Sequence, residues 1–470
     1  MLNLTDPKTI TVNDGVDDIK YSVIGNIYQL IKGATATAGG KTAVTTLGAN
    51  SISFKFPDLY DANFLASTKV DFELNDEAEL VGTVTSGSVS LDLNRKTQTI
   101  KVKDKVSGVE RSLEVVARTA DVINLEPGSW TDYTSEFAAR TGAVVPSSVT
   151  VYKTDKLNGQ NGRVGYTIAI PAGSVQAKLV AKGELSDPNK NSIVSKVLHD
   201  NPDWGVFVPF QCPGVWQWDS GSPEKKYISP IVYKDGKSYR TPGFDGNASR
   251  KMCPPVISVI DSKAQIRFAE LIDGKIYSFD RFTRTPSAET GSVWDVPFAV
   301  SGYFMILYNG ENLIGGENTQ SYEVYKSEYL MSPDMRCQLT PSWKNDPINN
   351  YMALHAGRVA LGVTKKGDLV ILQVAMLMNS HNQGQKEHKN KEDVFGSTMF
   401  ETAEELKRMG CETAMLIDDN YWSCILMQDG GKFNDGPLYG VDFFQHQIRY
   451  NLDNDKRQSE LANLAVLMLK

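Results

Sequence analysis

An arginine at the start of one strand-like run and an aspartate at the end of another are the residues best placed to do chemistry in this sequence. Arg358 precedes an apolar run that begins at Val359, and Asp418 closes the run Ala414-Met-Leu-Ile. A guanidinium offers a planar fork that can donate two charge-assisted hydrogen bonds to a phosphodiester, whereas lysine would offer a point charge. A carboxylate at the edge of a sheet can act as acid or base in glycosyl transfer, or can hold a cation.

These residues define the site that we expect. Arg358 would contact a phosphate, Asp418 would assist cleavage, and Ser423 is a weaker third catalytic candidate. Each has a competing interpretation: Arg358 as an exposed hairpin arginine, and Asp418 as a turn-forming residue before Asp419-Asn420.

Aromatic side chains crowd into residues 204–218. Sugars present apolar faces of C–H groups that stack on aromatic rings, and Trp supplies binding area at low entropic cost. Trp216 and Trp218 alternate before Asp-Ser-Gly and are the expected exposed pair, with Phe210 as a further candidate for substrate binding. The competing interpretation is that these rings belong to the hydrophobic core.

Patterns for metal and phosphate-loop sites fail on inspection. His381 and His388 lie in a polar stretch without a helix to place them as a zinc pair, so a long loop is expected there. Residues 451–455 alternate oxygen ligands but lack the glycine and glutamate of a calcium loop. Residues 40–42 end like a phosphate-binding loop but lack its first glycine, so we expect a flexible small-residue turn over residues 34–46. We expect no cofactor and no metal.

Composition limits the class of protein. The chain of 470 residues, with 41% hydrophobic and 22% charged residues, fits a folded protein of two or three domains. A net charge of −7 without a concentrated basic run argues against nucleic acid as a partner. Five cysteines without a C-x-x-C pair favour buried free thiols made in a reducing cytoplasm. No apolar stretch approaches about eighteen residues and no signal-peptide pattern is present, so no membrane span is expected.

The first part of the chain is strand-like. Short β-branched runs separated by Gly, Asn and Asp predict a β-rich attachment domain over residues 1–118. Residues 119–189 contain turn signals and two strand-like runs, which indicate a small β module, and the polar residues 184–191 are the expected linker.

Helical periodicity enters the sequence after residue 190. Residues 191–199 form one candidate helix, and in residues 398–409 the positions Phe400, Ala403, Leu406 and Met409 fall on one face beneath a Glu-Glu-Lys-Arg surface. Strand-like runs lie between them, so an α+β domain is expected over residues 190–470. The last twelve residues predict an apolar helix or strand that packs on the core or on a neighbouring subunit. The predicted fold class is therefore multidomain, with all-β N-terminal modules and an α+β domain.

Four segments, in order, carry a resemblance to a known family: residues 203–237, residues 298–310 with Gly302, and two more specific segments. The run from Gly357 to Gly367 has an Arg-x-Ala-apolar-Gly hairpin with a lysine-glycine turn, and the helix at 402–410 feeds the strand that ends at Asp418. Together they resemble the phosphodiester-glycosidase family, which includes the enzyme that uncovers mannose 6-phosphate. The resemblance implies a phosphodiester-glycosidase-like domain in residues 192–470 and adds Gly302 and Asn420 as substrate-binding candidates. The chain departs from the family at 419–421, where side chains replace consecutive glycines and remove room for a ligand.

A β-rich front, a glycan-directed back, no signal peptide and cytoplasmic-style cysteines are the features expected of a bacteriophage tail or baseplate protein. Its partners would be host surface glycans such as teichoic acid and other virion proteins, the latter contacted through the N-terminal part. A homo-oligomer is expected, with a trimer as one option, and the location would be the virion. The alternatives are a catalytically inactive, lectin-like receptor-binding protein and a structural baseplate component.

Overall fold

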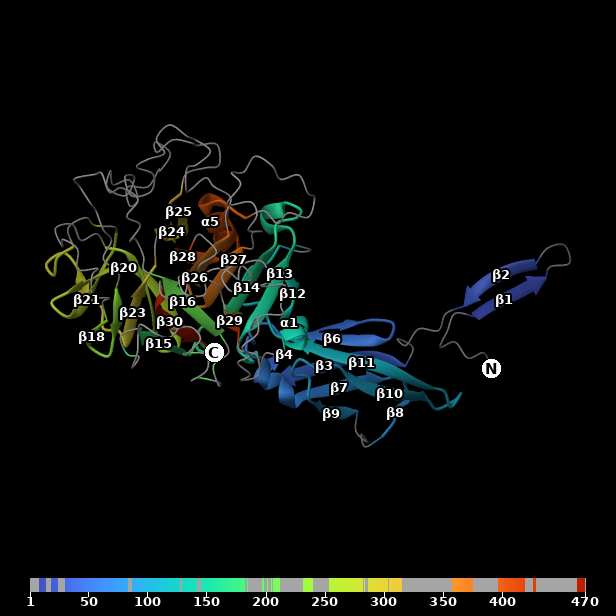
Figure 1. Cartoon of the computed structure of the whole chain (residues 1–470). Coiled ribbons are helices and arrows are strands. Elements are labelled where there is room, and N and C mark those ends of the chain that lie inside the picture. The colour runs from blue at the N-terminus through green and yellow to red at the C-terminus, as the bar shows by residue number, and fades with distance from the viewer. Residues whose placement is uncertain are drawn as a thin grey trace. The chain divides into compact units, whose positions relative to one another are not determined.

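The computed structural model of the chain divides into two compact units, Met1–Asp121 and Val122–Lys470 (Figure 1). It describes residues 8–13, 18–23, 30–82, 87–126, 129–141, 145–181, 184, 197, 201, 204, 206–211, 231–239, 253–281, 283, 286–302, 304–314, 357–374, 396–418, 426–427 and 463–469. The expected helix at 191–199, the linker at 184–191 and the polar stretch with His381 and His388 fall almost wholly outside these residues.

The first unit is made of strands whose side chains alternate between core and solvent. In β6, Ile52 and Phe54 are buried between half-buried neighbours, which is the period of two that strand geometry imposes. The elements are β1 (Lys8–Asn13), β2 (Asp18–Val23), β3 (Ile31–Ala38), β4 (Lys41–Thr42), β5 (Val44–Leu47), β6 (Ser51–Lys55), the 3-10 helix η2 (Ala62–Ser67), β7 (Thr68–Leu74), β8 (Ala78–Leu80), β9 (Ser88–Leu91), β10 (Gln98–Asp104) and β11 (Glu110–Arg118). The β-rich first domain is present, and the unit ends at Asp121, close to the expected boundary at 118.

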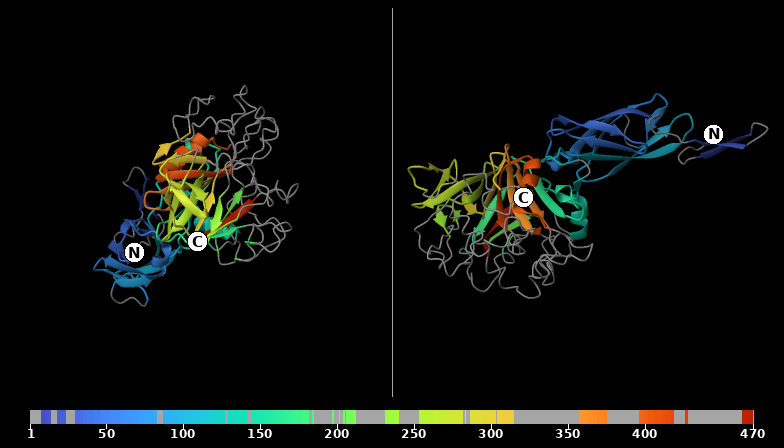
Figure 2. Two further views of the ribbon diagram at one scale, coloured as in Figure 1. Left: turned by 90° about the vertical axis from the view of Figure 1, so that its left-hand side faces the viewer. Right: turned by 90° about the horizontal axis from the view of Figure 1, so that it is seen from above.

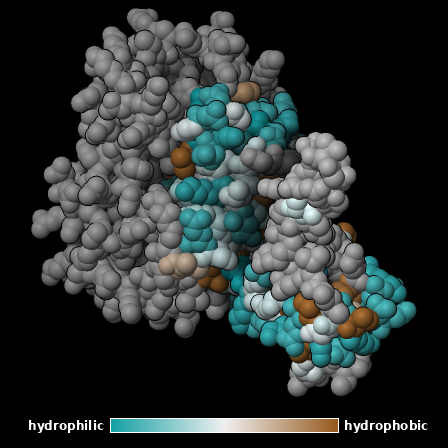
Figure 3. All heavy atoms as spheres, turned by 90° about the vertical axis from the view of Figure 1, so that its right-hand side faces the viewer, coloured by the Kyte–Doolittle hydropathy of each residue, from teal (hydrophilic) through white to brown (hydrophobic). Residues whose placement is uncertain are grey.

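The described strands of this unit form three sheets. β1 pairs with β2, the order β4-β3-β7-β9 forms a four-stranded sheet, and β5-β6-β11-β10-β8 forms a five-stranded sheet. Side chains of the two larger sheets share one core, which includes Ile52, Val70 and Leu113. Hydrophobic patches, coloured brown in Figure 3, interrupt the hydrophilic surface, and Val44 and Phe64 are among the exposed hydrophobic residues.

The expectation of a flexible turn over residues 34–46 is wrong. The chain forms β3 and β4 there, joined by a tight turn at Gly39 and Gly40, whose φ values are 52° and 73°. Because a Cβ at Gly39 would lie 2.9 Å from the Phe64 ring, glycine serves both the left-handed backbone and the packing.

The second unit is also mainly β-sheet. Its elements are β12 (Thr131–Asp132), α1 (Thr134–Thr141), β13 (Thr150–Thr154), the 3-10 helix η3 (Leu157–Gly159), β14 (Gly165–Ile170), β15 (Ala177–Ala181), β16 (Val206–Gln211), β17 (Val232–Lys234), β18 (Lys237–Ser238), β19 (Pro255–Ile260), β20 (Lys263–Ile272), β21 (Lys275–Phe279), β22 (Ser292–Val293), β23 (Phe298–Ser301), β24 (Phe304–Tyr308), β25 (Glu311–Asn312), β26 (Arg358–Thr364), β27 (Leu369–Val374), α5 (Met399–Arg408), β28 (Cys411–Asp418), β29 (Leu426–Met427) and β30 (Asn463–Leu469). The protein is thus a multidomain, β-rich chain, and the helical share expected of an α+β domain is not confirmed by the described residues.

Two large sheets of this unit share a core. An eight-stranded sheet has the order β12-β13-β14-β27-β26-β28-β24-β25, and a seven-stranded sheet has the order β18-β17-β23-β19-β20-β21-β22. Figures 1 and 2 show the yellow-green strands β20, β21 and β23 beside the orange strands β26–β28. Phe268 on β20 and Leu361 on β26 belong to the same buried cluster, so the two sheets are packed against each other.

The small module expected over residues 119–189 is not a separate unit. β14 pairs with β27 from Gly165↔Val374 to Ile170↔Leu369, so these strands lie inside the eight-stranded sheet. Every residue of β14 is buried, since the strand is covered on both faces. Residues 165–170 belong to the larger domain because they pair with β27, which lies about two hundred residues later in the chain.

The C-terminal apolar segment is a strand in the sheet interior. β30 pairs with β15 on one side and with β16 on the other, in the four-stranded order β15-β30-β16-β29. Residues from Ala465 to Leu469 are buried, which confirms that this segment packs on the core. Of the two expected secondary structures, the strand is correct.

The helix expected at 398–409 is confirmed as α5. Thr398 accepts a hydrogen bond from the Glu401 N–H, and the Glu401 carboxylate accepts one from the Thr398 N–H, which together form a capping box. Ala403, Leu406 and Met409 are buried, as expected, whereas Phe400 is only partly buried and Met399, which was not predicted, is buried. Glu405 does not join the charged surface that the sequence predicted, because it is buried and accepts a hydrogen bond from the Trp130 indole N–H at 3.0 Å.

Candidate functional site

The backbone brings the two expected catalytic positions to the same end of neighbouring strands. In the antiparallel ladder, Arg358 lies opposite Val374, and Val359 lies opposite Asp418. The first residue of β26 is therefore adjacent in register to the last residue of β28. The side chain of Asp418 lies outside the described part of the structure, so the meeting of its carboxylate with the arginine stays a prediction.

The Arg358 side chain is wholly buried. Its exposed fraction is 0%, which excludes the competing interpretation of an exposed hairpin arginine. The Nε atom donates a hydrogen bond to the Ser397 carbonyl oxygen at 3.1 Å, so the guanidinium is held beside the residue that precedes the N-cap of α5. Burying a guanidinium costs free energy unless hydrogen bonds or opposite charges compensate it. The Ser397 carbonyl supplies one such hydrogen bond to Arg358.

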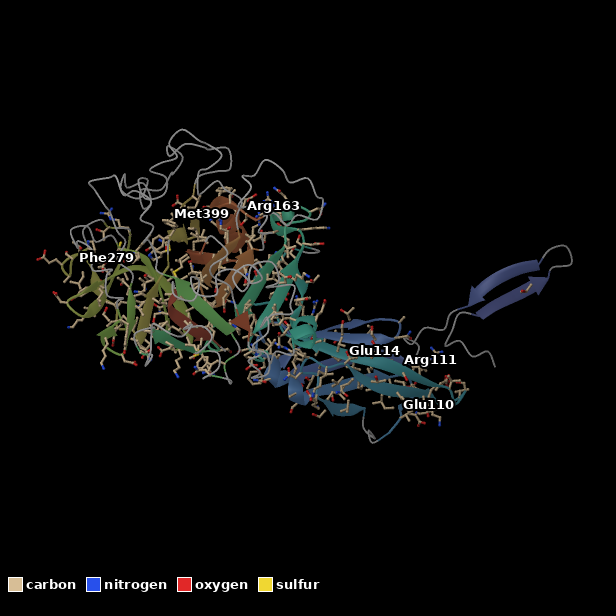
Figure 4. All side chains as sticks on the ribbon, viewed as in Figure 1. Glu110, Arg111, Glu114, Arg163, Phe279 and Met399 are labelled. Carbon is tan, nitrogen blue, oxygen red and sulfur yellow. The ribbon has the colours of Figure 1, made fainter. Side chains whose placement is uncertain are left out.

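The N-terminus of α5 does not offer an anion site of its own. Thr398 and Glu401 satisfy each other's backbone N–H groups in the capping box. Arg163, which is labelled in Figure 4, forms an ion pair with Glu401. The acidic residue in the first turn also complements the positive end of the helix. A phosphate near Arg358 would therefore have to be bound by side chains rather than by this helix end.

The seven-stranded sheet reaches the same end of the core through Gly302. The N–H of Gly302 donates to the Pro255 carbonyl at 2.9 Å, while a Cβ at Gly302 would lie 2.8 Å from the Leu416 carbonyl oxygen. Leu416 lies two residues before Asp418, and Pro255 is the first residue of β19. The start of β19 and the end of β28 are therefore close together.

A buried carboxylate that the sequence analysis missed lies on this side. Glu270 has 0% of its side chain exposed, and one of its oxygens accepts a hydrogen bond from the Leu271 N–H at 3.0 Å. Glu270 lies on the same face of β20 as Ala264, Ile266 and Phe268, which are buried in the shared core. A carboxylate in an otherwise apolar alternation was the signal that could have identified it.

Cys253 is the neighbour of Glu270 in this cluster. The β19–β20 register ends at Pro255↔Phe268, and two residues further along, Cys253 comes next to Glu270. The Thr283 N–H donates to the Cys253 sulfur at 3.0 Å. Burial, and more weakly the charge of Glu270, raises the pKa of the Cys253 thiol to about 12. At neutral pH this sulfur is therefore a thiol rather than a nucleophilic thiolate.

Cys411 is likewise a buried free thiol. Burial raises its pKa above the ordinary value, and the Asp368 charge acts in the same direction. Among the described residues both Cys253 and Cys411 are free, in agreement with the expectation of buried thiols for these two positions.

Two candidates for substrate binding have structural roles instead. Phe210 is 2% exposed in β16 and belongs to the main core, so its ring faces are not available to a sugar. Gly302 separates β23 from β24, which enter different sheets, and the near contact with Leu416 explains why a glycine is needed. The chain changes sheets at this point.

The other candidates lie outside the described residues. Trp216, Trp218, Asn420 and Ser423 belong to this group. Within the described residues, no three His, Cys, Asp or Glu side chains gather closely enough to hold a metal ion. The helices described in the structure include none with the length and apolar character needed to cross a membrane.

Comparison with known proteins gives distant structural likenesses. The catalytic domain of zebrafish N-acetylglucosamine-1-phosphodiester alpha-N-acetylglucosaminidase, auto-inhibited by its pro-peptide, is 15% identical, with a TM-score of 0.36 over 68% of this chain and 81% of that one. A hypothetical protein from Synechocystis is 8% identical, with a TM-score of 0.33 over 94% of this chain and 80% of that one. Scores this low do not establish a shared fold. No protein-family model and no curated protein sequence matches the chain.

Proposed function

We propose that the second unit binds a phosphodiester-linked glycan of a bacterial cell wall, such as teichoic acid, and hydrolyses its sugar-1-phosphate linkage. The observation that carries the proposal is the wholly buried guanidinium of Arg358 at a strand end that is adjacent in register to Asp418. Phosphodiester cleavage at a sugar carbon needs a cation that grips the phosphate and a carboxylate that moves a proton. Both residue types are present at this end of the sheet.

The chemistry of the arginine suits this role. The Nε atom is already used by the Ser397 carbonyl, which fixes the plane of the guanidinium and orients the rest of the fork. A fork fixed in this way loses less entropy when it binds two phosphate oxygens. Asp418, with Ser423 as a further candidate, would assist cleavage from the end of β28.

The biological setting is part of the proposal. The first unit would attach the chain to other proteins of a bacteriophage tail or baseplate, and the second unit would contact the host surface. Support comes from the division into two separately packed units and from the hydrophobic core of the first, whose buried residues include no ionisable side chain among those described. The described core of the first unit contains no buried charged side chain comparable to Arg358 that could support a catalytic role.

Binding and release assays on the purified full chain test the proposal. Wall teichoic acid is incubated with the wild type and with the variants Arg358→Ala, Arg358→Lys and Asp418→Asn, and both bound glycan and released sugar and phosphate are measured. We expect Arg358→Ala to abolish binding and release, Arg358→Lys to weaken both, and Asp418→Asn to stop release alone. Arg163→Lys is the matched control, because that arginine is also buried and forms an ion pair with Glu401 at the start of α5.

Three results would count against the proposal. If the wild type binds the glycan but releases no product, the protein is a lectin-like binder and not an enzyme. If it neither binds nor releases, the protein is a structural component. If Arg358→Ala binds and cleaves the glycan as well as the wild type does, Arg358 does not contact the phosphate.

A further inference from the structure

The seven-stranded sheet has a second face, which does not contribute to the main core. Phe268 on β20 is buried in the core shared with the eight-stranded sheet, so its neighbours Arg267 and Ala269 lie on the opposite face, because successive side chains of a strand alternate. On that side Ala269 packs into a separate small core that includes Trp294. We call the side of β19–β22 that carries Arg267, Ala269 and Trp294 the distal face.

Three buried polar atoms on the distal face have no hydrogen-bond partner in the structure. Ser258 lies opposite Gln265 in the β19–β20 ladder, and Val256, two residues earlier, belongs to the small core. The Ser258 hydroxyl, the Gln265 side-chain oxygen and the Trp294 Nε1 atom are each buried and unpaired. Ser258 is 0% exposed and Trp294 is 5% exposed. Buried polar atoms are nearly always hydrogen-bonded in folded proteins, so three exceptions on one face require an explanation, such as a ligand or ordered water.

Arg267 is the exposed charged residue beside these atoms. It follows Gln265 by two residues on the same face of β20, and its guanidinium carbon lies 5.2 Å from the centre of the Trp294 ring. Stacking on a ring uses the flat face of a guanidinium and leaves the N–H groups at its edge free to donate. Within the described residues this guanidinium has no hydrogen bond and no ion pair. It is therefore available to an anion.

We propose that the distal face is a second binding site for the phosphodiester-linked glycan, an inference that rests on the proposed function of the second unit. Arg267 binds a phosphate of the polymer, and in doing so it moves off the ring of Trp294. The three unpaired atoms bind hydroxyl groups of the adjoining sugar. A hydroxyl both donates and accepts hydrogen bonds, so it can satisfy the Trp294 N–H as well as the Gln265 oxygen. A simple anion would leave that oxygen without a donor.

The distal face and Arg358 lie on opposite sides of the two packed sheets. Arg358 and Gly362 share one face of β26, and a Cβ at Gly362 would lie 3.1 Å from Leu406 of α5. Arg358 is thus on the side of the helix, whereas Arg267 is on the far side of the seven-stranded sheet. A long polymer can engage both sites, one repeat at each. The second contact is then intramolecular, which tightens overall binding without any change at Arg358.

The test compares a polymer with a single repeat, using the full chain and Arg267→Ala. The probes are purified wall teichoic acid and one synthetic sugar 1-phosphodiester unit. We expect the dissociation constant of the polymer to rise about 10²-fold, the usual scale of lost avidity, while cleavage of the single unit is unchanged. Lys275→Ala is the matched control, because Lys275 is an exposed cation on β21 that lies on the opposite face from Ile276 of the small core. It should bind both probes as the wild type does.

Two further variants test the buried polar atoms. Ser258→Ala removes the hydroxyl, and Trp294→Phe removes the N–H but keeps an aromatic ring beneath Arg267. We expect each to weaken polymer binding about 2–10-fold, the effect of one hydrogen bond. Polymer binding unchanged in both variants would assign these atoms to ordered water and overturn the sugar contacts of the distal face.

The outcomes also separate the distal site from the proposed function. Polymer binding in Arg267→Ala equal to that of the wild type overturns the distal site and leaves Arg358 and the proposed function standing. Equal weakening in Arg267→Ala and Lys275→Ala overturns it as well, because net charge then explains the loss. A wild type that binds neither probe overturns both proposals.

Discussion

The cores of the two units differ in the polar groups that they bury. In the first unit the described buried residues are hydrophobic except for Thr68, whose hydroxyl donates to the Leu65 carbonyl at 2.9 Å. In the second unit the buried side chains include Arg163, Glu270, Arg358, Asp368, Glu401 and Glu405. Charges of the first unit lie nearer the surface, as Glu110 and Glu114 do along β11 (Figure 4).

This difference indicates what each unit is built to do. A buried charge costs free energy unless partners compensate it, so a fold that retains several uses them either to hold elements together or to do chemistry. The first unit is stabilised by hydrophobic burial and needs no such groups. The second unit uses Arg163, Asp368, Glu401 and Glu405 to fix α5 and the β26–β27 turn, and Arg358 is the buried charge on which its proposed function rests.

Breaking a buried ion pair should give the largest loss of stability. Arg163→Ala leaves the Glu401 carboxylate buried without its cation, and we expect it to lower the free energy of unfolding of the second unit by about 3–5 kcal/mol. Calorimetry of the full chain, with hydrogen exchange to assign each transition to a unit, measures the effect. Lys96→Ala is the control, because its pair with Asp92 is 60% and 40% exposed and should contribute little to stability. Equal losses in both variants would refute the contrast between the units.

Truncating the core of the first unit should act on that unit alone. Leu113 is wholly buried in the core shared by its two larger sheets, so Leu113→Ala should lower the free energy of unfolding by about 2–5 kcal/mol. Hydrogen exchange should show the loss in residues 30–121, with the protection of the second unit and its glycan binding unchanged. Loss of glycan binding in this variant would mean that the first unit takes part in recognition.

A methyl group at the junction of the two large sheets should have a smaller effect. Gly302→Ala would place a Cβ 2.8 Å from the Leu416 backbone carbonyl, which cannot move without disturbing β28. We expect overpacking to cost the second unit about 1–3 kcal/mol. In the first unit, a Cβ at Gly33 would meet the Glu73 carboxylate at 3.1 Å, and this flexible side chain can move aside. Gly33→Ala should therefore cost less, and a larger cost there would contradict this explanation.

Local patterns predicted much of the fold. Short strand-like runs predicted the β-rich character of residues 1–118, and the spacing of Ala403, Leu406 and Met409 predicted α5. The pairing of β14 with β27 was missed because no local pattern encodes a partner two hundred residues away. The site was predicted in part: Arg358 was identified from its position at a strand start, but Glu270 was overlooked within an apolar run.

The smallest expected effect is a pH dependence in the first unit. Asp104 accepts hydrogen bonds from the N–H groups of Ser107 at 3.2 Å and Val106 at 2.8 Å in the turn between β10 and β11. Hydrogen bonds from Ser107, followed by that from Val106, lower the pKa of the Asp104 carboxyl below its usual range, and Arg111 adds a weaker attraction. Because the folded-state pKa is the lower one, this contribution to stability is full above the unfolded value of about 3.9 and is lost as pH falls through the folded value.

Asp104→Asn should therefore flatten the dependence of first-unit stability on pH between about 5 and 2, without affecting the second unit. The measurement is the unfolding midpoint of the first unit in urea at stepped pH, assigned by hydrogen exchange. Asp76→Asn removes one charge from the same unit at a side chain that is 99% exposed, and it is the control for net charge. If both variants flatten the curve equally, net charge rather than the turn explains the pH dependence. If only Asp104→Asn flattens the curve, an exposed carboxylate of the first unit stabilises it through hydrogen bonds to the backbone. The second unit, by contrast, buries several of its carboxylates.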